Sequence, residues 1–234
     1  MSLTQHGSHL FRLPRFGLVN SYFVREAGGL TLIDANLPGS EKAILQAAQK
    51  IGLPITRIVL THAHGDHIGS LDALHAALPQ AEISISARDA RLLAGDLSLD
   101  AGEGSNKLKG DLKGAKTCPD RLLQDGDKVG SLRAVAAPGH TPGHFAFLDE
   151  RDNTLIAGDA FQAAGGLAVA GQMRWLFPFP ALATWDAARA AESAARLTEL
   201  NPSRLAVGHG AVLENPVEAM RKVVKEAQRG VALP

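Results

Sequence analysis

The sequence predicts an α/β fold in which helices cover the faces of sheets, and three observations lead to this prediction. Strand-like apolar stretches alternate with stretches of helical periodicity up to about residue 93, a series that favours sheets packed against helices. The chain has 234 residues, enough to bury roughly 70–75% of the unfolded surface without disulfides. A cluster of histidine and aspartate follows one predicted strand directly, at a strand-to-helix corner. We expect one domain over residues 1–234.

The first expected elements are two strands joined by a glycine-rich turn, over residues 16–25 and 30–34. Ser40 is the expected N-cap of a helix whose apolar positions share one face, and Gly52 with Pro54 ends it. A strand over residues 55–60 comes next. The residues before this region, 1–9, are polar and read as a flexible tail.

A helix that Pro79 closes should follow that strand, and after it a strand over residues 81–86 and a short helix over 87–93. Residues 94–119 then lose all periodicity, with several glycines and lysines. A loop this long inside a compact domain is usually functional or mobile. We expect it to form a lid or the rim of a pocket; a disordered insertion is the alternative.

Regular structure resumes near residue 121. The expected elements are strands over 121–129, 132–137, 144–149, 154–157 and 205–207, and helices over 184–200 and from Asn215 to about 229. Residues 167–180 are apolar and read as a loop.

The composition excludes several classes of protein. Lys plus Arg and Asp plus Glu are equal at 24 each, which argues against a broad nucleic-acid footprint. The single cysteine, Cys118, cannot form an intramolecular disulfide and fits a reducing compartment. No apolar run is long enough for a membrane span, and the N-terminal residues lack a signal-peptide core. We therefore expect a cytoplasmic protein without a membrane or nucleic-acid partner.

Four residues able to bind a metal lie within six positions directly after the apolar run 58–60: His62, His64, Asp66 and His67. Alternate residues of a strand point to one side, so His62 and His64 can share a face. Imidazole and carboxylate suit zinc, manganese or iron. The stretch therefore predicts a metal site.

Three further candidates stand beside glycine at predicted strand ends. His140 lies in Pro-Gly-His-Thr-Pro-Gly-His, Asp159 in Ala-Gly-Asp-Ala, and His209 in Gly-His-Gly. Small neighbours let the backbone come close to an ion. Periodicity alone does not bring the seven donors together in space.

In this order the motifs resemble those of the metallo-β-lactamase superfamily, over residues 61–210. The resemblance implies an αββα sandwich of two mixed sheets with helices outside and the metals at one edge. It also implies that His62, His64 and His140 hold one metal, that Asp66, His67 and His209 hold a second, and that Asp159 bridges them.

The resemblance implies the chemistry as well. Two divalent ions, most often zinc but also manganese or iron, can share a hydroxide that attacks an electrophilic carbon. Asp66 could accept a proton or pass one to the leaving group. Asp34 and His144 are expected to orient neighbouring groups through hydrogen bonds, although Asp34 could equally be a turn-capping residue.

The substrate is left open. Superfamily members that hydrolyse β-lactams generally lack an aspartate at the position of Asp159, whereas the thioesterases and lactonases that this chain resembles carry one. The resemblance therefore argues against β-lactam hydrolysis. The chain resembles glyoxalase II and the acyl-homoserine lactonases, but Ala63, Ser70 and Gln162 depart from their patterns. We therefore expect a hydrolase of esters, lactones or thioesters of small molecules; the alternatives are a mononuclear-iron persulfide dioxygenase and a phosphodiester hydrolase or nuclease.

Apolar residues cluster after Asp159, and we expect several of them to form a wall of the substrate pocket. The candidate substrate-binding residues are Phe161, Gln162, Trp175 and Phe177, with Met173 and Phe179 nearby. The alternative is that these side chains pack in the core or at a homodimer interface.

Overall fold

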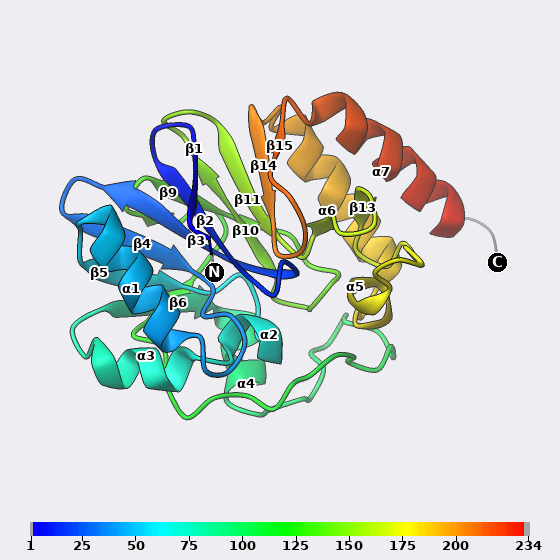
Figure 1. Ribbon diagram of the computed structural model, residues 1–234. Helices are drawn as coiled ribbons and strands as arrows, with labels where there is room; N and C mark the ends of the chain where they lie inside the picture. The colour runs from blue at the N-terminus through cyan, green and yellow to red at the C-terminus, as the bar shows by residue number, and fades with distance from the viewer. Residues whose placement is uncertain (1, 232–234) are drawn as a thin grey trace. The chain divides into compact units, whose positions relative to one another are not determined.

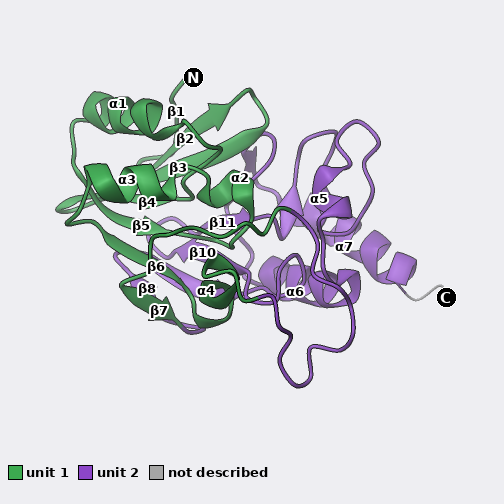
Figure 2. Ribbon diagram, turned by 90° about the horizontal axis from the view of Figure 1, so that it is seen from below, with its two compact units in different colours: residues 1–96, 111–123 green, residues 97–110, 124–234 purple. Residues whose placement is uncertain are grey.

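The computed structural model describes residues 2–231, and the chain divides into two compact units (Figure 2). Unit 1 takes the residues up to 96 together with 111–123, and unit 2 takes 97–110 and the residues from 124 onward. Each unit contains one mixed sheet and its own helices (Figure 1).

The sheet of unit 1 has seven strands in chain order, the first four antiparallel and the last four parallel, with β4 common to both sets. The strands are β1 (Thr4–His6), β2 (Leu10–Arg15), β3 (Val19–Glu26), β4 (Gly29–Ile33), β5 (Ile55–Val59), β6 (Glu82–Ser86) and β7 (Arg121–Leu123). Strand β4 is buried throughout, and β5 buries both of its ends, as expected in the middle of a sheet.

The helices of unit 1 are α1 (Glu41–Ile51), α2 (Gly65–Ile68), α3 (Leu71–Ala77) and α4 (Ala87–Leu93). Helix α1 starts after Ser40 and ends at Gly52, whose φ of 82° needs glycine. The single helix expected before Pro79 is two helices, α2 and α3. Between them a Cβ on Gly69 would lie 2.3 Å from the ring of Pro38, so the chain turns there around a close backbone contact.

The main sheet of unit 2 has the order β15-β14-β11-β10-β9-β8, and its only parallel pair in the described residues is β11 with β14. These strands are β8 (Lys128–Val129), β9 (Leu132–Ala136), β10 (Phe145–Asp149), β11 (Thr154–Gly158), β14 (Arg204–Val207) and β15 (Leu213–Glu214). A small separate ribbon pairs β12 (Phe161–Gln162) with β13 (Ala168–Val169).

The helices of unit 2 are α5 (Phe179–Leu182), α6 (Ala187–Glu199) and α7 (Val217–Val231). The N-cap of helix α6 is Asp186, whose carboxylate accepts the N–H groups of Ala188 and Arg189. Helices α6 and α7 lie side by side (Figure 1) and bury small and aliphatic residues in one apolar cluster with β10, β11 and β14. This core fixes the strand ends that carry the candidate site residues of unit 2.

The predicted fold class is confirmed: the fold is mixed α/β, with two mixed sheets and helices. The flexible tail predicted over residues 1–9 is wrong in part, because Thr4–His6 pair with β2. The side chains of β1 are mostly exposed, so the strand is held by backbone hydrogen bonds and leaves no apolar pattern in the sequence.

Three element boundaries also differ from expectation. Residues 16–18 form the turn between β2 and β3 rather than a strand. The strand expected over 121–129 is divided between β7 in one unit and β8 in the other. The stretch 167–180 contains β13 and the start of α5. Among the described residues, no helix has the length and apolar content needed to cross a bilayer.

Candidate metal centre

The four predicted ligands of unit 1 lie where β5 ends and α2 begins. Because β5 is flanked by parallel strands, its carboxyl end lies at the edge where α/β proteins place functional side chains. His62, His64 and His67 are buried, and the carboxylate of Asp66 is 31% exposed. The corner therefore presents three desolvated imidazoles and one accessible acid.

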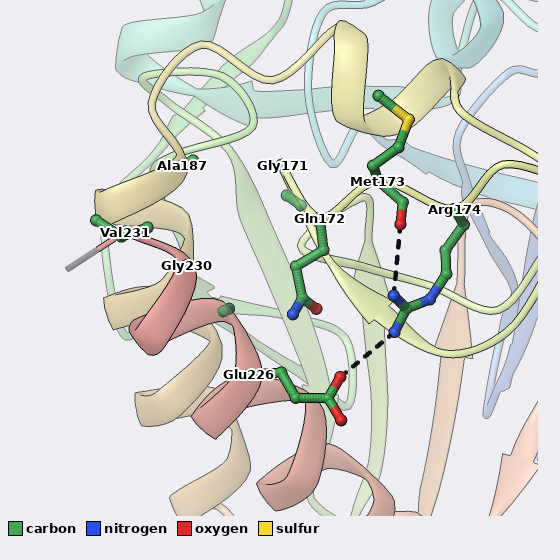
Figure 3. A pocket seen from close by; sticks show the side chains of 10 residues that line it. Gly171, Gln172, Met173, Arg174, Ala187, Glu226, Gly230 and Val231 are labelled. Atoms are coloured by element: carbon green, nitrogen blue, oxygen red, sulfur yellow. Dashed lines mark hydrogen bonds and ion pairs between the residues drawn. The ribbon is translucent and has the colours of Figure 1, made fainter. Parts of the chain in front are cut away.

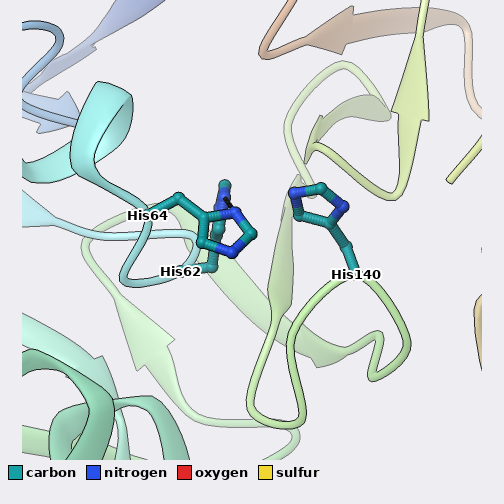
Figure 4. Close-up of side chains that lie close together, drawn as sticks. All are labelled: His62, His64 and His140. Carbon is teal, nitrogen blue, oxygen red and sulfur yellow. Dashed lines mark hydrogen bonds between the residues drawn. The ribbon is translucent and has the colours of Figure 1, made fainter. Parts of the chain in front are cut away.

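Their ligand atoms lie close together within the unit. His62 Nε2 is 3.1 Å from His64 Nδ1, and His67 Nε2 is 3.8 Å from Asp66 Oδ2. Two nitrogens that bind one tetrahedral zinc at its usual bond length are separated by roughly 3.3 Å. The pair of His62 and His64, seen at the end of β5 in Figure 4, therefore fits two ligands of one ion.

A buried carboxylate on β4's end fixes two of these imidazoles. Asp34 accepts the backbone N–H of Thr61 at 2.8 Å, the Thr61 hydroxyl at 2.8 Å, and His67 Nδ1 at 2.7 Å. The Thr61 hydroxyl uses its one hydrogen to donate to Asp34. It must therefore act as the acceptor toward His62 Nδ1, 2.9 Å away. Both His62 and His67 thus carry a proton on Nδ1, so Nε2 is the nitrogen of each ring that could bind a metal.

Two further contacts hold the backbone of this corner. Asp89 of α4, fully buried, accepts the N–H of Ala63 at 3.1 Å. The N–H of Gly65 donates to the carbonyl of Asp111, and a Cβ on Gly65 would lie 2.5 Å from the Asp111 carboxylate. Neither Asp89 nor Thr61 was among the predicted site residues, and only Thr61, next to the motif, carried any signal.

In unit 2, His140 lies on the loop between β9 and β10 (Figure 4). Its Nδ1 is 3.1 Å from Thr184 Oγ1, which donates its own proton to the carbonyl of Pro180 at 2.7 Å. The hydroxyl must therefore accept from His140 Nδ1, so Nε2 is the ring nitrogen that could bind a metal. Nothing in the sequence motif pointed to Thr184.

Backbone hydrogen bonds attach the loop that carries His140 to the residues directly before α6. The carbonyls of Gly139 and His140 accept the N–H groups of Asp186 and Trp185. Gly139 has a φ of 141°, and a Cβ there would lie 2.3 Å from the amide nitrogen of Ala190. This glycine is needed because the loop backbone lies against the helix.

Asp159 follows β11 and lies between two imidazoles of its own unit. Its Oδ2 is 3.4 Å from His140 Nε2 and 3.0 Å from His209 Nε2. The N–H of Asp159 donates to His144 Nε2 at 3.1 Å. His144 thus contacts the backbone of a candidate ligand, and its orienting role stays a prediction.

His209 follows β14, parallel to β11. Its carbonyl accepts the N–H groups of Ala163 and Ala164, and its ring lies 5.1 Å from the ring of Phe177. Gly210 packs against the backbone of Ala163, with space for no side chain. The loop after β12 and the His209 loop therefore hold each other.

The four predicted substrate-binding residues occupy different environments. Phe161 and Gln162 are buried in β12, and Phe177 is buried against His209. Trp175 is 88% exposed. Gln162 Nε2 donates to the carbonyl of Phe177, while its Oε1 is buried without a hydrogen-bond partner among residues 2–231. Its contact with substrate stays a prediction.

The predicted lid, residues 94–119, contains no helix or strand but is tied down at several points. In unit 1 the amides of Lys116 and Thr117 and the Thr117 hydroxyl donate to the Asp72 carboxylate. Burial by itself would raise the pKa of Asp72, but these hydrogen bonds outweigh it and lower the pKa below its ordinary 3.8. In unit 2, Trp185 Nε1 donates to the carbonyl of Asn106. Gating by this loop stays a prediction.

Comparison with known proteins gives the family. The model of the metallo-beta-lactamase superfamily matches residues 14–209. The chain belongs to the metallo-β-lactamase superfamily. Members bind divalent metals and are mostly hydrolases, and the buried imidazole and carboxylate donors of both units are chemically suited to such ions.

Two relatives come from Bacillus subtilis. The chain is 50% identical over 233 residues to the uncharacterized protein YobT, covering 98% of this chain and all of that one. It is 29% identical to the probable metallo-hydrolase YflN, over 82% and 81% of the two chains. A hydroxyacylglutathione hydrolase of Rhodospirillum rubrum is 31% identical over 145 residues, which are 60% of this chain and 46% of that protein.

Solved structures agree on the fold. A β-lactamase from Chitinophaga pinensis superposes with a TM-score of 0.70 at 21% identity, over 97% of this chain and 91% of its own. The crystal structure of TTHA1623 in a di-iron-bound form gives a TM-score of 0.64 at 28% identity, over 89% and 95%.

Proposed function

We propose that the protein is a dinuclear metal-dependent hydrolase that cleaves an ester, lactone or thioester bond of a small molecule. His62, His64 and His140 would bind one metal, and Asp66, His67 and His209 the second. Asp159 would bind both. Zinc is the first candidate, with manganese and iron as alternatives.

The observation that carries this proposal is the position of the Asp159 carboxylate. One oxygen lies within 3.4 Å of both His140 and His209, the two histidines of unit 2 that the family pattern assigns to different metals. A carboxylate placed between ligands of two ions can bind both and offset part of their mutual repulsion. A structural turn residue would not need this position.

The residues of the chain prepare the site before any ion binds. Asp34, Thr61 and Thr184 accept hydrogen bonds from Nδ1 of His67, His62 and His140 in turn, so Nε2 is the nitrogen of each ring that would bind a metal. When bound, two divalent ions supply a water that is deprotonated near neutral pH and polarise the carbonyl of the substrate. Asp66 is the most exposed carboxylate of the set, so it is placed to receive a proton and transfer it to the leaving group.

The relatives support the reaction class and leave the metal open. A probable metallo-hydrolase and a hydroxyacylglutathione hydrolase are among them, which supports hydrolysis. The di-iron form of TTHA1623 supports iron as an alternative to zinc. A small-molecule substrate also fits the zero net charge better than a nucleic acid does.

The test combines metal analysis with turnover. Protein expressed without added metal is dialysed, its metal content measured, and its activity screened against lactones, thioesters and esters. We expect about two ions per chain in the wild type. For Asp159→Ala we expect about one ion, a loss of activity of at least about a hundredfold, and an unchanged circular dichroism spectrum.

A matched control is Asp125→Asn, which changes a carboxylate of the same unit that accepts the N–H of Ala136 and should keep two ions. A mutant of Asp159 with two ions and full activity would contradict the bridging role. One iron per wild-type chain, with oxygen uptake and no hydrolysis, would instead identify a dioxygenase.

A further inference from the structure

Large apolar side chains that face solvent are concentrated in residues 173–182 of unit 2, called here the apolar segment. They are Met173, Trp175, Leu176, Phe179 and Leu182, exposed by 37, 88, 87, 65 and 60%. Isolated exposed apolar residues are ordinary, but several within ten positions of the chain are typical of a binding surface.

The apolar segment is anchored at its centre to a candidate metal ligand. Phe177 is only 7% exposed, and its ring lies 5.1 Å from the His209 ring and 5.3 Å from the Phe179 ring. Gln162 donates to the carbonyl of Phe177, and the Phe177 N–H donates to the carbonyl of Arg174. The backbone that carries the exposed side chains is therefore held at Phe177, whose ring lies beside the ring of His209.

The start of the apolar segment is fixed by Arg174. Its Nε and Nη2 donate to the carbonyl of Leu167 at 3.2 and 2.7 Å, and its Nη2 lies 3.7 Å from the Glu226 carboxylate of α7 (Figure 3). The adjoining cavity, of about 430 Å³, is lined by none of the predicted ligands. Since Arg174 and Gln172 bond to protein groups, we assign no ligand to this cavity.

We propose that the apolar segment binds the apolar acyl or aryl group of the substrate, an inference that rests on the hydrolase function proposed above. The substrate class is then an ester, lactone or thioester that carries an alkyl chain of several carbons or an aromatic ring. Continuity with His209 favours this occupant over a second copy of the chain, since an apolar surface that starts at a metal ligand adjoins the reacting bond.

The first experiment measures kcat/KM of metal-loaded protein on p-nitrophenyl esters from acetate to decanoate. Each methylene that becomes buried contributes about fourfold in binding, so the wild type should prefer longer chains. In Trp175→Ala, Leu176→Ala and Phe179→Ala we expect the decanoate value to fall at least about tenfold more than the acetate value. The control is Leu122→Ala, an exposed leucine on β7, which should keep the wild-type preference.

The second experiment needs neither metal nor turnover. Of the two tryptophans, Trp175 is exposed and Trp185 is 2% exposed, so fluorescence that responds to solvent comes from Trp175. Decanoate added to metal-free protein should shift the emission to shorter wavelength and protect it from acrylamide, and Trp175→Phe should remove both responses.

The outcomes separate this inference from the proposed hydrolase. A Trp175 response without turnover of any ester supports the apolar binding surface while contradicting the hydrolase. Turnover with no Trp175 response and uniform losses across the ester series overturns the inference and leaves the hydrolase intact. A wild-type dimer that Trp175→Ala converts to a monomer, with unchanged chain-length preference, also overturns it.

Discussion

Three of the candidate imidazoles, those of His62, His67 and His140, each have an oxygen atom at Nδ1, on the side of the ring away from the Nε2 that would bind a metal. For His67 and His62 the chain of contacts ends at Asp34, which has the left-handed φ of 62° that is uncommon outside glycine. A left-handed backbone at a buried carboxylate that contacts one candidate ligand directly and a second through Thr61 is typical of a functional site.

We predict that Asp34→Asn weakens the second metal site. An amide keeps only one acceptor oxygen. Its NH₂ group would therefore oppose either the backbone N–H of Thr61, or both the Thr61 hydroxyl and the N–H of His67, which share Asp34 Oδ2. The affinity for the second ion should fall about 10–100-fold, as for other outer partners of metal ligands, which competition with a chelator measures. Asp120→Asn, which alters a carboxylate that accepts the N–H of Ile83, should leave the affinity unchanged; equal affinities in both variants would contradict the role of Asp34.

At the scale of elements, the site depends on strand ends and on the segments that fix them. Loop backbones lie against a helix or another loop at Gly139 and Gly210, where a side chain would collide with the neighbouring backbone. The long loop over residues 94–119 has no helix or strand, and hydrogen bonds to Asp72 attach it to α3 in unit 1. Such a segment opens at a lower free energy than the core.

We predict that attachment of this loop depends on the charge of Asp72. The lowered pKa of Asp72 means that the folded state favours the charged carboxylate. The attachment is therefore complete above pH 3.8, the ordinary pKa of aspartate. It weakens as the pH falls through the lower pKa that Asp72 has in the folded protein. At neutral pH, Asp72→Asn should reduce hydrogen-exchange protection of Lys116 and Thr117 by about fivefold, the difference between charged and neutral acceptors. Unchanged protection, with Asp96→Asn as control, would show that the carboxylate is dispensable.

At the scale of the whole molecule, the predicted ligands are divided between the two units, four in unit 1 and three in unit 2. If both metals take ligands from each unit, as we propose, binding links the stability of one unit to that of the other. We therefore expect the single domain predicted over residues 1–234 to unfold as one cooperative body.

We predict one unfolding transition by calorimetry, whose midpoint falls by about 5–10 °C when the metals are removed. This is the shift expected when about 2.7 kcal/mol of ligand stabilisation is lost from a chain of this size. Metal-free protein with zinc restored should recover the midpoint, whereas magnesium should not. Two separate transitions, only one of them dependent on zinc, would show that the units fold independently.

The sequence by itself determined the family, the fold class and the candidate ligands, because these depend on local patterns. Strand periodicity placed the buried run before His62, and glycines marked the strand ends that carry His140, Asp159 and His209. The donors of such a motif are close together in the sequence, so the motif can be recognised without a structure.

Only the tertiary structure decided the contacts between residues far apart in the chain. Thr184 holds His140 from 44 positions away, and Asp34 holds His67 from 33 positions away. Strand β1 and the division of residues 121–129 also depend on backbone pairing with distant strands rather than on side-chain pattern. Phe177 is buried against His209 while Trp175, two residues away, is exposed. An apolar loop has no periodicity from which this difference in burial can be predicted.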